Sequence, residues 1–257
     1  MRVAAVFTDL DGTLLEPDGR VCDEVLAVLT ELREARVPVC PLTSKTAAEL
    51  GPIMAMLGLA TPAGLENGAG VLLGDEKVEL LPAAVPVVEL VASLVRARVE
   101  TGAPVRTILE LRDDELSVFT GLHGGALSAA RARQATLPLV VEGSWDDTLR
   151  AALVPSRPLR LIRGNKFLHL QGDHDKITVV PRLVELLGRN AGVTVACGDS
   201  PNDAQLLAWA DVPIIVPGRD GPHPELTRVV RHARVAPLPH GRGWAASLRH
   251  ILDQADA

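Results

Sequence analysis

The sequence predicts an α/β fold with a parallel sheet, into which a smaller α+β domain is inserted. Three observations indicate this. Short apolar runs alternate with helical patterns in residues 3–57 and again in 177–216, as in successive βαβ units. Two of these runs end abruptly in carboxylates, at the strand ends where open α/β sheets place their ligands. Between the two stretches, from Pro82 onward, prolines and mixed helix and strand patterns replace the alternation.

The first strand is predicted at 3–7, a continuous apolar run of the kind that is covered on both faces of a sheet. Asp9 and Asp11 follow it directly, with Gly12 allowing a sharp turn. Two neighbouring carboxylates raise the pKa of one of them, so the pair suits a hard cation such as Mg2+. A strand-end turn without a function explains the same residues, and the string alone leaves both interpretations open.

A second polar cluster is predicted beside the first. A strand over 37–42 ends in Thr43-Ser-Lys-Thr46, directly before a helix predicted over 47–57. A right-handed crossover brings this cluster to the same sheet edge. Hydroxyl and ammonium groups at a helix start suit a phosphoryl oxygen. Capping of the helix by Thr43 or Ser44 is the alternative.

Two more clusters follow in the second α/β stretch. Lys176 stands near the start of a helix predicted over 177–189, where its charge opposes the helix dipole and indicates a nearby anion. A strand predicted over 193–197 ends in Gly198-Asp-Ser-Pro-Asn-Asp203, which again puts carboxylates at a strand end. Helix capping would need only one of those polar residues.

We expect the inserted domain to span 83–171, with a larger core formed by 1–82 and 172–257. A polar, acidic segment around Asp113 and repeated prolines distinguish the insert from its surroundings. Its expected helices lie at 87–100, 126–135 and near 147–153, and its expected strands at 137–141, 159–163 and 167–170. This mixture is typical of a small α+β domain within a larger fold.

The chain resembles the haloacid dehalogenase superfamily of phosphatases, whose four motifs match, in order, D-L-D-G-T at 9–13, T-S-K-T at 43–46, Lys176 and G-D-S-P-N-D at 198–203. T-S-K-T, together with E-N-G-A at 66–69, resembles the mannosyl-3-phosphoglycerate phosphatase branch. The resemblance implies a Rossmann-like haloacid dehalogenase core with a C2-type cap. It also implies a Mg2+-dependent phosphatase that forms an aspartyl phosphate and acts on a phosphorylated sugar-glycerate.

The resemblance implies a role for each matching residue. Asp9 becomes the nucleophile and Asp11 the acid and base, while Thr43 and Lys176 hold the phosphoryl oxygens. The implied metal site draws on Asp9, Asp11 through its carbonyl, Asp199 and Asp203. The implied substrate-binding residues are Lys45, Glu66, Asn67, Gly68, Arg133, Lys166, His169 and Asn202.

The insert departs from this branch at several positions. Asn165 and Lys166 replace the usual second Gly and the Arg of G-G-R-F-x-H, and Gln134 replaces an acidic residue. Ile177 stands where a Gly is usual. Lysine is a point charge, whereas arginine is a planar fork, so recognition of a carboxylate stays open. Solvated surface charges are the alternative for Arg133 and Lys166.

Composition narrows the choice of partners. A net charge of -6 and an aromatic content of 2% argue against nucleic acid as the main partner. The chain has no apolar run long enough to cross a bilayer and no cationic, apolar leader, so we expect a cytoplasmic protein without membrane contact. The expected partner is a small-molecule sugar phosphate, and the expected state is a monomer or weak homodimer.

Scattered cysteines and histidines add no further site. The three cysteines are few and far apart, which favours buried apolar residues over disulfides or a zinc site. The histidines of the C-terminal segment lack ligand spacing and are expected at the surface, whereas Trp244 is expected to pack the last helix onto the core. These residues are Cys22, Cys40, Cys197, His223, His232, His240 and His250.

Other functions stay open at this point. A phosphatase of another sugar phosphate, such as glucosyl-3-phosphoglycerate or a disaccharide phosphate, would share every core residue. A phosphomutase would keep the phosphoenzyme from water, so phosphate release would exclude it. A non-catalytic binding protein would not need the Asp11 carboxyl group.

Overall fold

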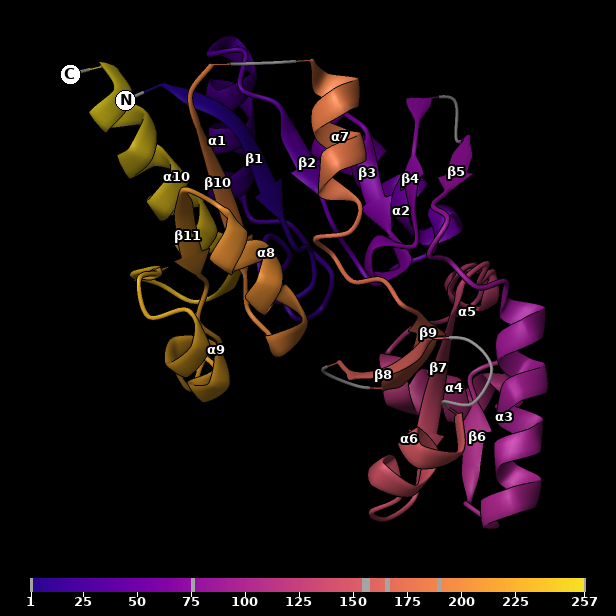
Figure 1. The fold of residues 1–257 in the computed structure, drawn as a ribbon. Coiled ribbons are helices and arrows are strands. Elements are labelled where there is room, and N and C mark those ends of the chain that lie inside the picture. Colours follow the sequence, from indigo (N-terminus) through magenta and orange to yellow (C-terminus); the bar gives the residue numbers. More distant parts are fainter. Residues whose placement is uncertain (1, 75–76, 154–157, 165–166, 189–190, 257) are drawn as a thin grey trace.

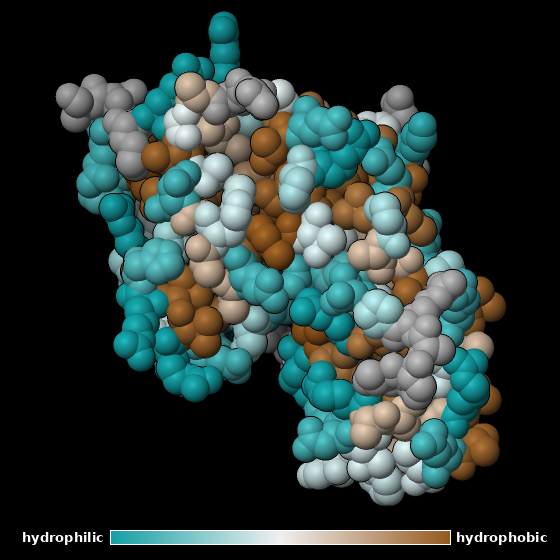
Figure 2. All heavy atoms as spheres, viewed as in Figure 1, coloured by the Kyte–Doolittle hydropathy of each residue, from teal (hydrophilic) through white to brown (hydrophobic). Residues whose placement is uncertain are grey.

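The computed structural model describes residues 2–74, 77–153, 158–164, 167–188 and 191–256 (Figure 1). It confirms the predicted α/β architecture, a core with a parallel sheet and an inserted α+β cap. The space-filling view shows an indentation between the cap and the part of the core that carries α9, Pro224–Val229 (Figure 2). Within the described ranges, no helix combines the length and apolar character that crossing a membrane requires.

The core sheet has five parallel strands in the order β12-β11-β10-β1-β2. Its strands are β1 Val3–Thr8, β2 Val39–Pro41, β10 Val193–Gly198, β11 Val212–Ile215 and β12 Arg234–Val235. Thr8 pairs with Cys197 on one side and with Pro41 on the other. The polar clusters that follow β1, β10 and β2 therefore meet at one edge of the sheet.

Helices cover both faces of this sheet. They are α1 Asp23–Glu34, α2 Ala47–Leu57, α7 Val180–Leu187, α8 Ala204–Trp209, α9 and α10 His240–Asp256. One apolar cluster joins Val6 to α1, α2 and α10, and a second joins Phe7 to α7 and α8. Alternate β1 side chains thus enter two separate layers, because successive side chains of a strand point to opposite faces.

Beside the core sheet lies a small antiparallel sheet of β3 Ala63–Leu65, β4 Gly70–Leu72 and β5 Val78–Leu80. The predicted turn between short strands is a 3-10 turn at Glu66–Gly68, where Glu66 and Asn67 both have positive φ. A parallel bridge from Leu42 to Gly64 joins this sheet to the end of β2. The 66–68 turn consequently lies next to the second polar cluster.

The cap contains a four-stranded antiparallel sheet in the order β6-β7-β9-β8. Its elements are α3 Val87–Thr101, β6 Val105–Thr107, α4 Asp113–Thr120, α5 Gly125–Arg131, β7 Thr136–Val141, α6 Asp146–Leu153, β8 Leu159–Arg163 and β9 Leu168–Gly172. The sequence did not predict β6 or α4. The positions 83 and 171 for the edges of the insert stay a prediction.

Two helices differ in length from the prediction, for local reasons. The helix expected to reach residue 135 ends at Arg131, because the backbone N–H groups of the following residues bond to Glu66. The helix expected from Ile177 begins at Val180. There, Asp175 and Thr178 form a side-chain turn that competes with the first helical turn.

The contacts of α10 confirm one expectation and correct another. Trp244 is fully buried, and its Nε1 donates to Thr8 Oγ1 at 3.0 Å. Thr8 is the residue immediately before Asp9. The expectation that His240 is a surface residue was wrong. It is half-buried, with Nδ1 3.1 Å from the carbonyl oxygen of Gly12. The start of α10 therefore supports the first polar cluster from behind. Cys40 and Cys197 are buried as expected, Cys22 partly so.

We expect Trp244→Ala to lower the free energy of unfolding by about 3–5 kcal/mol, because it leaves a cavity in the core. Trp244→Phe should cost about 1–3 kcal/mol, from the lost volume and the lost bond to Thr8. Urea unfolding measures both. Trp209→Phe is the control, since that side chain is 42% exposed, and a loss there as large as in Trp244→Phe would contradict the assignment.

Candidate active site

Three carboxylates converge at the carboxyl edge of the core sheet. Asp9 follows β1, Asp199 follows β10, and Asp203 ends the 3-10 turn after it. One ligand oxygen from each lies within 4.8 Å of the others. They meet because β1 and β10 are adjacent and parallel, so that both chains leave the sheet at the same level.

Lys176 lies in the middle of this cluster and is almost completely buried. Its Nζ donates to Asp9 Oδ1 at 2.5 Å and to Asp203 Oδ1 at 2.7 Å. Burial alone would lower the pKa of Lys176, but the two carboxylates raise it above its ordinary value. The lysine therefore stays charged and ties residues from two strand ends together.

The cluster has an excess of negative charge that fits a divalent cation. Three carboxylates face one ammonium group, which leaves two negative charges in a largely buried place. Burial is the main cause that raises the pKa of Asp9, and Asp203 and Asp199 raise it further, against the opposing effect of Lys176. Carboxylate oxygens are the ligands that Mg2+ prefers, so the residues present fit this ion.

The backbone around the cluster requires small residues and fixed loops. Gly12 has φ +82, and a Cβ there would lie 2.5 Å from Asp199 Oδ2, so only glycine fits without displacing a carboxylate. Asp203 Oδ2 accepts from the backbone N–H groups of Asp199 at 3.2 Å and Ser200 at 3.1 Å. The Ser200 hydroxyl in turn donates to Asn202 Oδ1. Asn202 is thus held within this loop.

The second polar cluster lies beside the first, as expected. Lys45 Nζ is 2.8 Å from Asp11 Oδ2. Burial lowers the pKa of Lys45, but Asp11 and Glu49 outweigh it, so the amine is charged. Thr43 is buried, and its Oγ1 accepts from the backbone N–H of Lys45 at 3.2 Å. Among the described residues, Lys45 thus places an ammonium group beside Asp11, and Lys176 places one beside Asp9.

Capping by Thr43 or Ser44, the alternative explanation for these residues, was wrong. The helix is capped by Thr46, whose hydroxyl accepts from the backbone N–H of Glu49 at 3.1 Å, while the Glu49 carboxylate accepts from the N–H of Thr46. This capping box leaves the Thr43 side chain at the sheet edge, near Lys45.

The cap contributes residues that reach the same edge. His169 on β9 is buried, and Arg133 bonds to the core through Ser44 O at 2.6 Å and Glu49 Oε2 at 3.4 Å. The guanidinium of Arg133 is therefore engaged by the core rather than solvated. Lys166, together with Asn165, lies outside the described residues.

Residues Glu66, Asn67 and Gly68 occupy the joint between cap and core. Asn67 Nδ2 donates to Gln171 Oε1 at 3.0 Å, and a Cβ at Gly68 would lie 2.0 Å from the backbone oxygen of Asp175. Gln171 was missed by the sequence reasoning. Its signal is a polar side chain in the middle of an apolar strand, two residues after His169.

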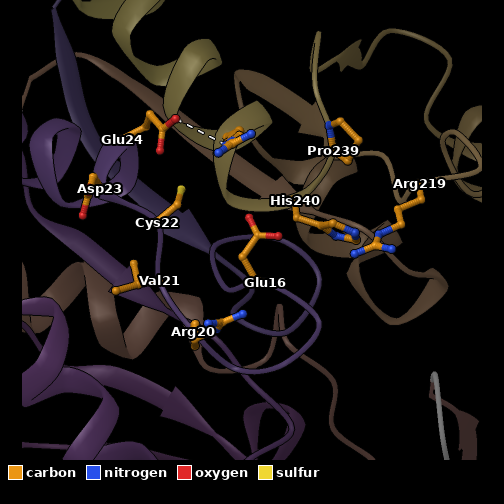
Figure 3. A pocket seen from close by; sticks show the side chains of 10 residues that line it. Glu16, Arg20, Val21, Cys22, Asp23, Glu24, Arg219, Pro239 and His240 are labelled. Atoms are coloured by element: carbon orange, nitrogen blue, oxygen red, sulfur yellow. Dashed lines mark ion pairs between the residues drawn. The ribbon is translucent and has the colours of Figure 1, made fainter.

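A surface cavity lies beside the start of α1 and the start of α10, away from the three carboxylates. It has a volume of about 680 Å3, and Figure 3 shows the residues around it. Both acidic and basic side chains line it, and Glu24 pairs with Arg242 at 3.3 Å. His240 connects this cavity to the loop that contains Asp9 and Gly12. Its lining supports the loop from the rear.

The environment of His169 generates a prediction for stability. Burial, helped by Arg133 and Lys176, lowers the pKa of His169 from 6.5 to about 3. Below pH 6.5 the His169 ring binds a proton in the unfolded chain but stays neutral in the folded chain. The stability that the folded chain has with a neutral ring is therefore fully present above pH 6.5 and is lost as the pH falls. The free energy of unfolding should fall by about 1.4 kcal/mol per pH unit there.

His169→Asn should therefore show a shallower decline in the free energy of unfolding between pH 7 and pH 5 than the wild type, measured by urea titration. His250→Asn is the matched control, because that ring is exposed. Parallel declines in the wild type and His169→Asn would show that the ring takes up its proton equally easily in both states.

Comparison with known proteins gives concordant results. A family model for haloacid dehalogenase-like hydrolases matches residues 6–114. A glucosyl-3-phosphoglycerate/mannosyl-3-phosphoglycerate phosphatase of Methanococcoides burtonii is 28% identical over 266 residues, which cover 96% of each chain.

Solved structures share the fold along the whole chain. A phosphatase of the haloalkanoate dehalogenase superfamily from Bacteroides thetaiotaomicron has a TM-score of 0.75 at 17% identity, covering 96% of this chain and 94% of its own. A subclass IIB sugar phosphatase has a TM-score of 0.73 at 16% identity, covering 97% and 99%. The family model and the relative therefore agree that this chain is similar to haloacid dehalogenase-like hydrolases, and the solved structures share its fold.

Proposed function

We propose that this protein is a Mg2+-dependent phosphatase that removes phosphate from a phosphorylated sugar-glycerate, such as mannosyl-3-phosphoglycerate, through an aspartyl phosphate. The observation that carries the proposal is the buried Lys176, which holds one oxygen of Asp9 among three carboxylates. A carboxylate fixed at one oxygen presents the other for attack on phosphorus. The similarity to the Methanococcoides burtonii phosphatase supports the substrate.

The proposed metal site uses Asp9, Asp199 and Asp203, with the backbone carbonyl of Asp11. The bound ion would neutralise charge on the phosphoryl oxygens. The chain's own hydrogen-bond donors act on the same oxygens, because the Lys176 ammonium and the Thr43 hydroxyl can donate to them. The excess of two negative charges described above is the structural argument for this ion.

The reaction then has two balanced steps. Asp9 attacks phosphorus, the bond to the ester oxygen breaks, and Asp11 gives its proton to the leaving alcohol. In the second step Asp11 takes a proton from water as this water attacks phosphorus, and the acyl phosphate bond breaks to release phosphate and restore Asp9. Lys45, at 2.8 Å from Asp11, orients that carboxyl group toward the ester oxygen.

Residues of the cap and the joint would choose the substrate. His169 stays neutral over the physiological range, because burial lowers its pKa, so it can hydrogen-bond sugar hydroxyls without adding charge. Lys45 and Lys166 are the proposed partners of the glycerate carboxylate. The proposed substrate contacts as a set are Lys45, Asn67, Gly68, Arg133, Lys166, His169 and Asn202.

A related phosphatase is the second candidate. The relative's name joins two substrates, glucosyl- and mannosyl-3-phosphoglycerate, and that pairing favours glucosyl-3-phosphoglycerate as an alternative here. A disaccharide phosphate would use the same core residues. A phosphomutase would release no phosphate in the assay, and a binding protein would not need the Asp11 carboxyl group, so both are less well supported.

The metal has a direct test. EDTA should abolish phosphate release, and Mg2+ should restore it, because the carboxylates need a cation to accept an anionic substrate. Asp199→Ala should bind Mg2+ much more weakly, measured by calorimetry, while Asp211→Ala, at an exposed carboxylate away from the cluster, should not change binding. Full activity of the chelated enzyme would rule out the metal role.

The two carboxylates of the first motif should separate in a phosphoenzyme assay. Asp9→Asn should give no phosphoenzyme, since the nucleophilic oxygen is lost. Asp11→Asn should slow turnover by ~10²–10⁴-fold through lost proton transfer, with the metal site still formed. Trapping labelled phosphate on the protein makes the distinction. Labelling of Asp9→Asn at the wild-type level would place the nucleophile at another residue.

A further inference from the structure

The carboxylate of Glu66 is enclosed by the cap, although its backbone belongs to the core. Its Oε1 accepts from the N–H of Gln134 at 2.8 Å. Its Oε2 accepts from the N–H of Ala135 at 3.0 Å, and from both the N–H and the hydroxyl of Thr136 at 2.7 Å. Four donors from one short cap segment therefore meet a single side chain of the core, which is 1% exposed.

The core fixes the position of this carboxylate from the other side. The backbone N–H of Glu66 donates to Lys45 O at 2.9 Å, and that of Asn67 donates to Thr43 O at 2.9 Å. Both residues have positive φ, a conformation that costs free energy for residues other than glycine and persists only where its surroundings enforce it. The second motif thus determines where the Glu66 side chain points.

The interaction depends on the cap being in place. Within the part of the chain that the structure describes, Glu66 has no cationic partner at salt-bridge distance. A buried carboxylate without a counter-ion is costly unless oriented N–H groups satisfy it, and here the cap supplies them. Displacement of residues 134–136 would leave the charge without its donors. The position in which the cap lies against Glu66, called the docked position below, is therefore favoured.

The segment that Glu66 holds leads directly to the substrate contacts. Thr136 begins β7, and Pro138 of this strand pairs with His169 of β9. Arg133 precedes the segment and bonds to Ser44. A shift at the start of β7 would move both proposed contacts relative to the core carboxylates.

We propose that Glu66 is a positioning residue that holds the cap in its place on the core and does not contact the substrate. This inference rests on the proposed phosphatase function. Substrates that touch the cap should need the docked position, and their apparent affinity falls with the fraction of molecules in that position. Small esters that touch only the core should not need it.

Glu66→Gln tests this, because it keeps the shape but replaces a charged acceptor with an amide. Kinetics would use a glycosyl-3-phosphoglycerate and p-nitrophenyl phosphate. We expect KM for the phosphoglycerate to rise about tenfold to a hundredfold with kcat little changed, since saturating substrate docks the cap itself. The p-nitrophenyl phosphate kcat/KM should stay at the wild-type level.

Amide hydrogen exchange is the second measurement, and it needs no substrate. Exchange of residues 134–136 should accelerate in Glu66→Gln, while that of 43–46 should not. Asp211→Asn is the matched control, because Asp211 also accepts from a backbone N–H and a threonine hydroxyl, both of Thr194 at 2.8 Å, within the core. It should leave exchange at 134–136 and both kinetic constants unchanged.

The outcomes separate the two proposals. An equal fall in kcat/KM for both esters, or unchanged exchange at 134–136, would overturn the positioning role. If Glu66→Gln does not fold, Thr136→Val removes one donor only and should give a smaller rise in KM and in exchange. If the wild type hydrolyses no ester, the proposed phosphatase function is wrong. The exchange measurement then still tests whether Glu66 holds the cap in position.

Discussion

The charge balance around Lys176 constrains the rest of the molecule. A buried ammonium with two carboxylate partners is stable only if its geometry is held on all sides, because a displaced partner leaves a charge in a medium that solvates it poorly. The cluster therefore requires the adjacency of β1 and β10, the tight turn at Gly12 and the amide bonds of Asp203. The parallel sheet is the scaffold that satisfies all three requirements together.

The site could be predicted from sequence where its signals are local. Asp9 and Asp199 each follow an apolar strand directly, Asp11 and Asp203 lie in the loops that continue from those strands, and the strand order of a βαβ fold then brings them to one edge. The inserted α+β domain was also predictable, because its prolines and mixed pattern interrupt the alternation. Strand β6 and helix α4 escaped prediction, since three residues are too few to show a period and Asp113 begins a helix that reads as an acidic loop.

Side-chain partners across the two domains could not be predicted. Arg133 and Glu66 are charged residues at the joint, and each finds its partner about 70 or more positions away, Arg133 on Ser44 and Glu66 on Thr136. No sequence period links such positions. His240 is a similar case, because its contact with Gly12 spans 228 positions. What the sequence does indicate is the presence of polar residues that need a partner.

The contacts of α10 with the first motif have a consequence for synthesis. Trp244 and His240 support the loop that contains Asp9 and Gly12. The ribosome adds these two residues after almost all of the other described residues. A nascent chain can pair β1 with β2 early, but the support behind the Asp9 loop arrives only when residue 244 has left the ribosome. Incomplete chains thus carry every motif residue up to Asp203 and still lack the packing that holds the first one in place. Dependence on such distant contacts also favours slow folding.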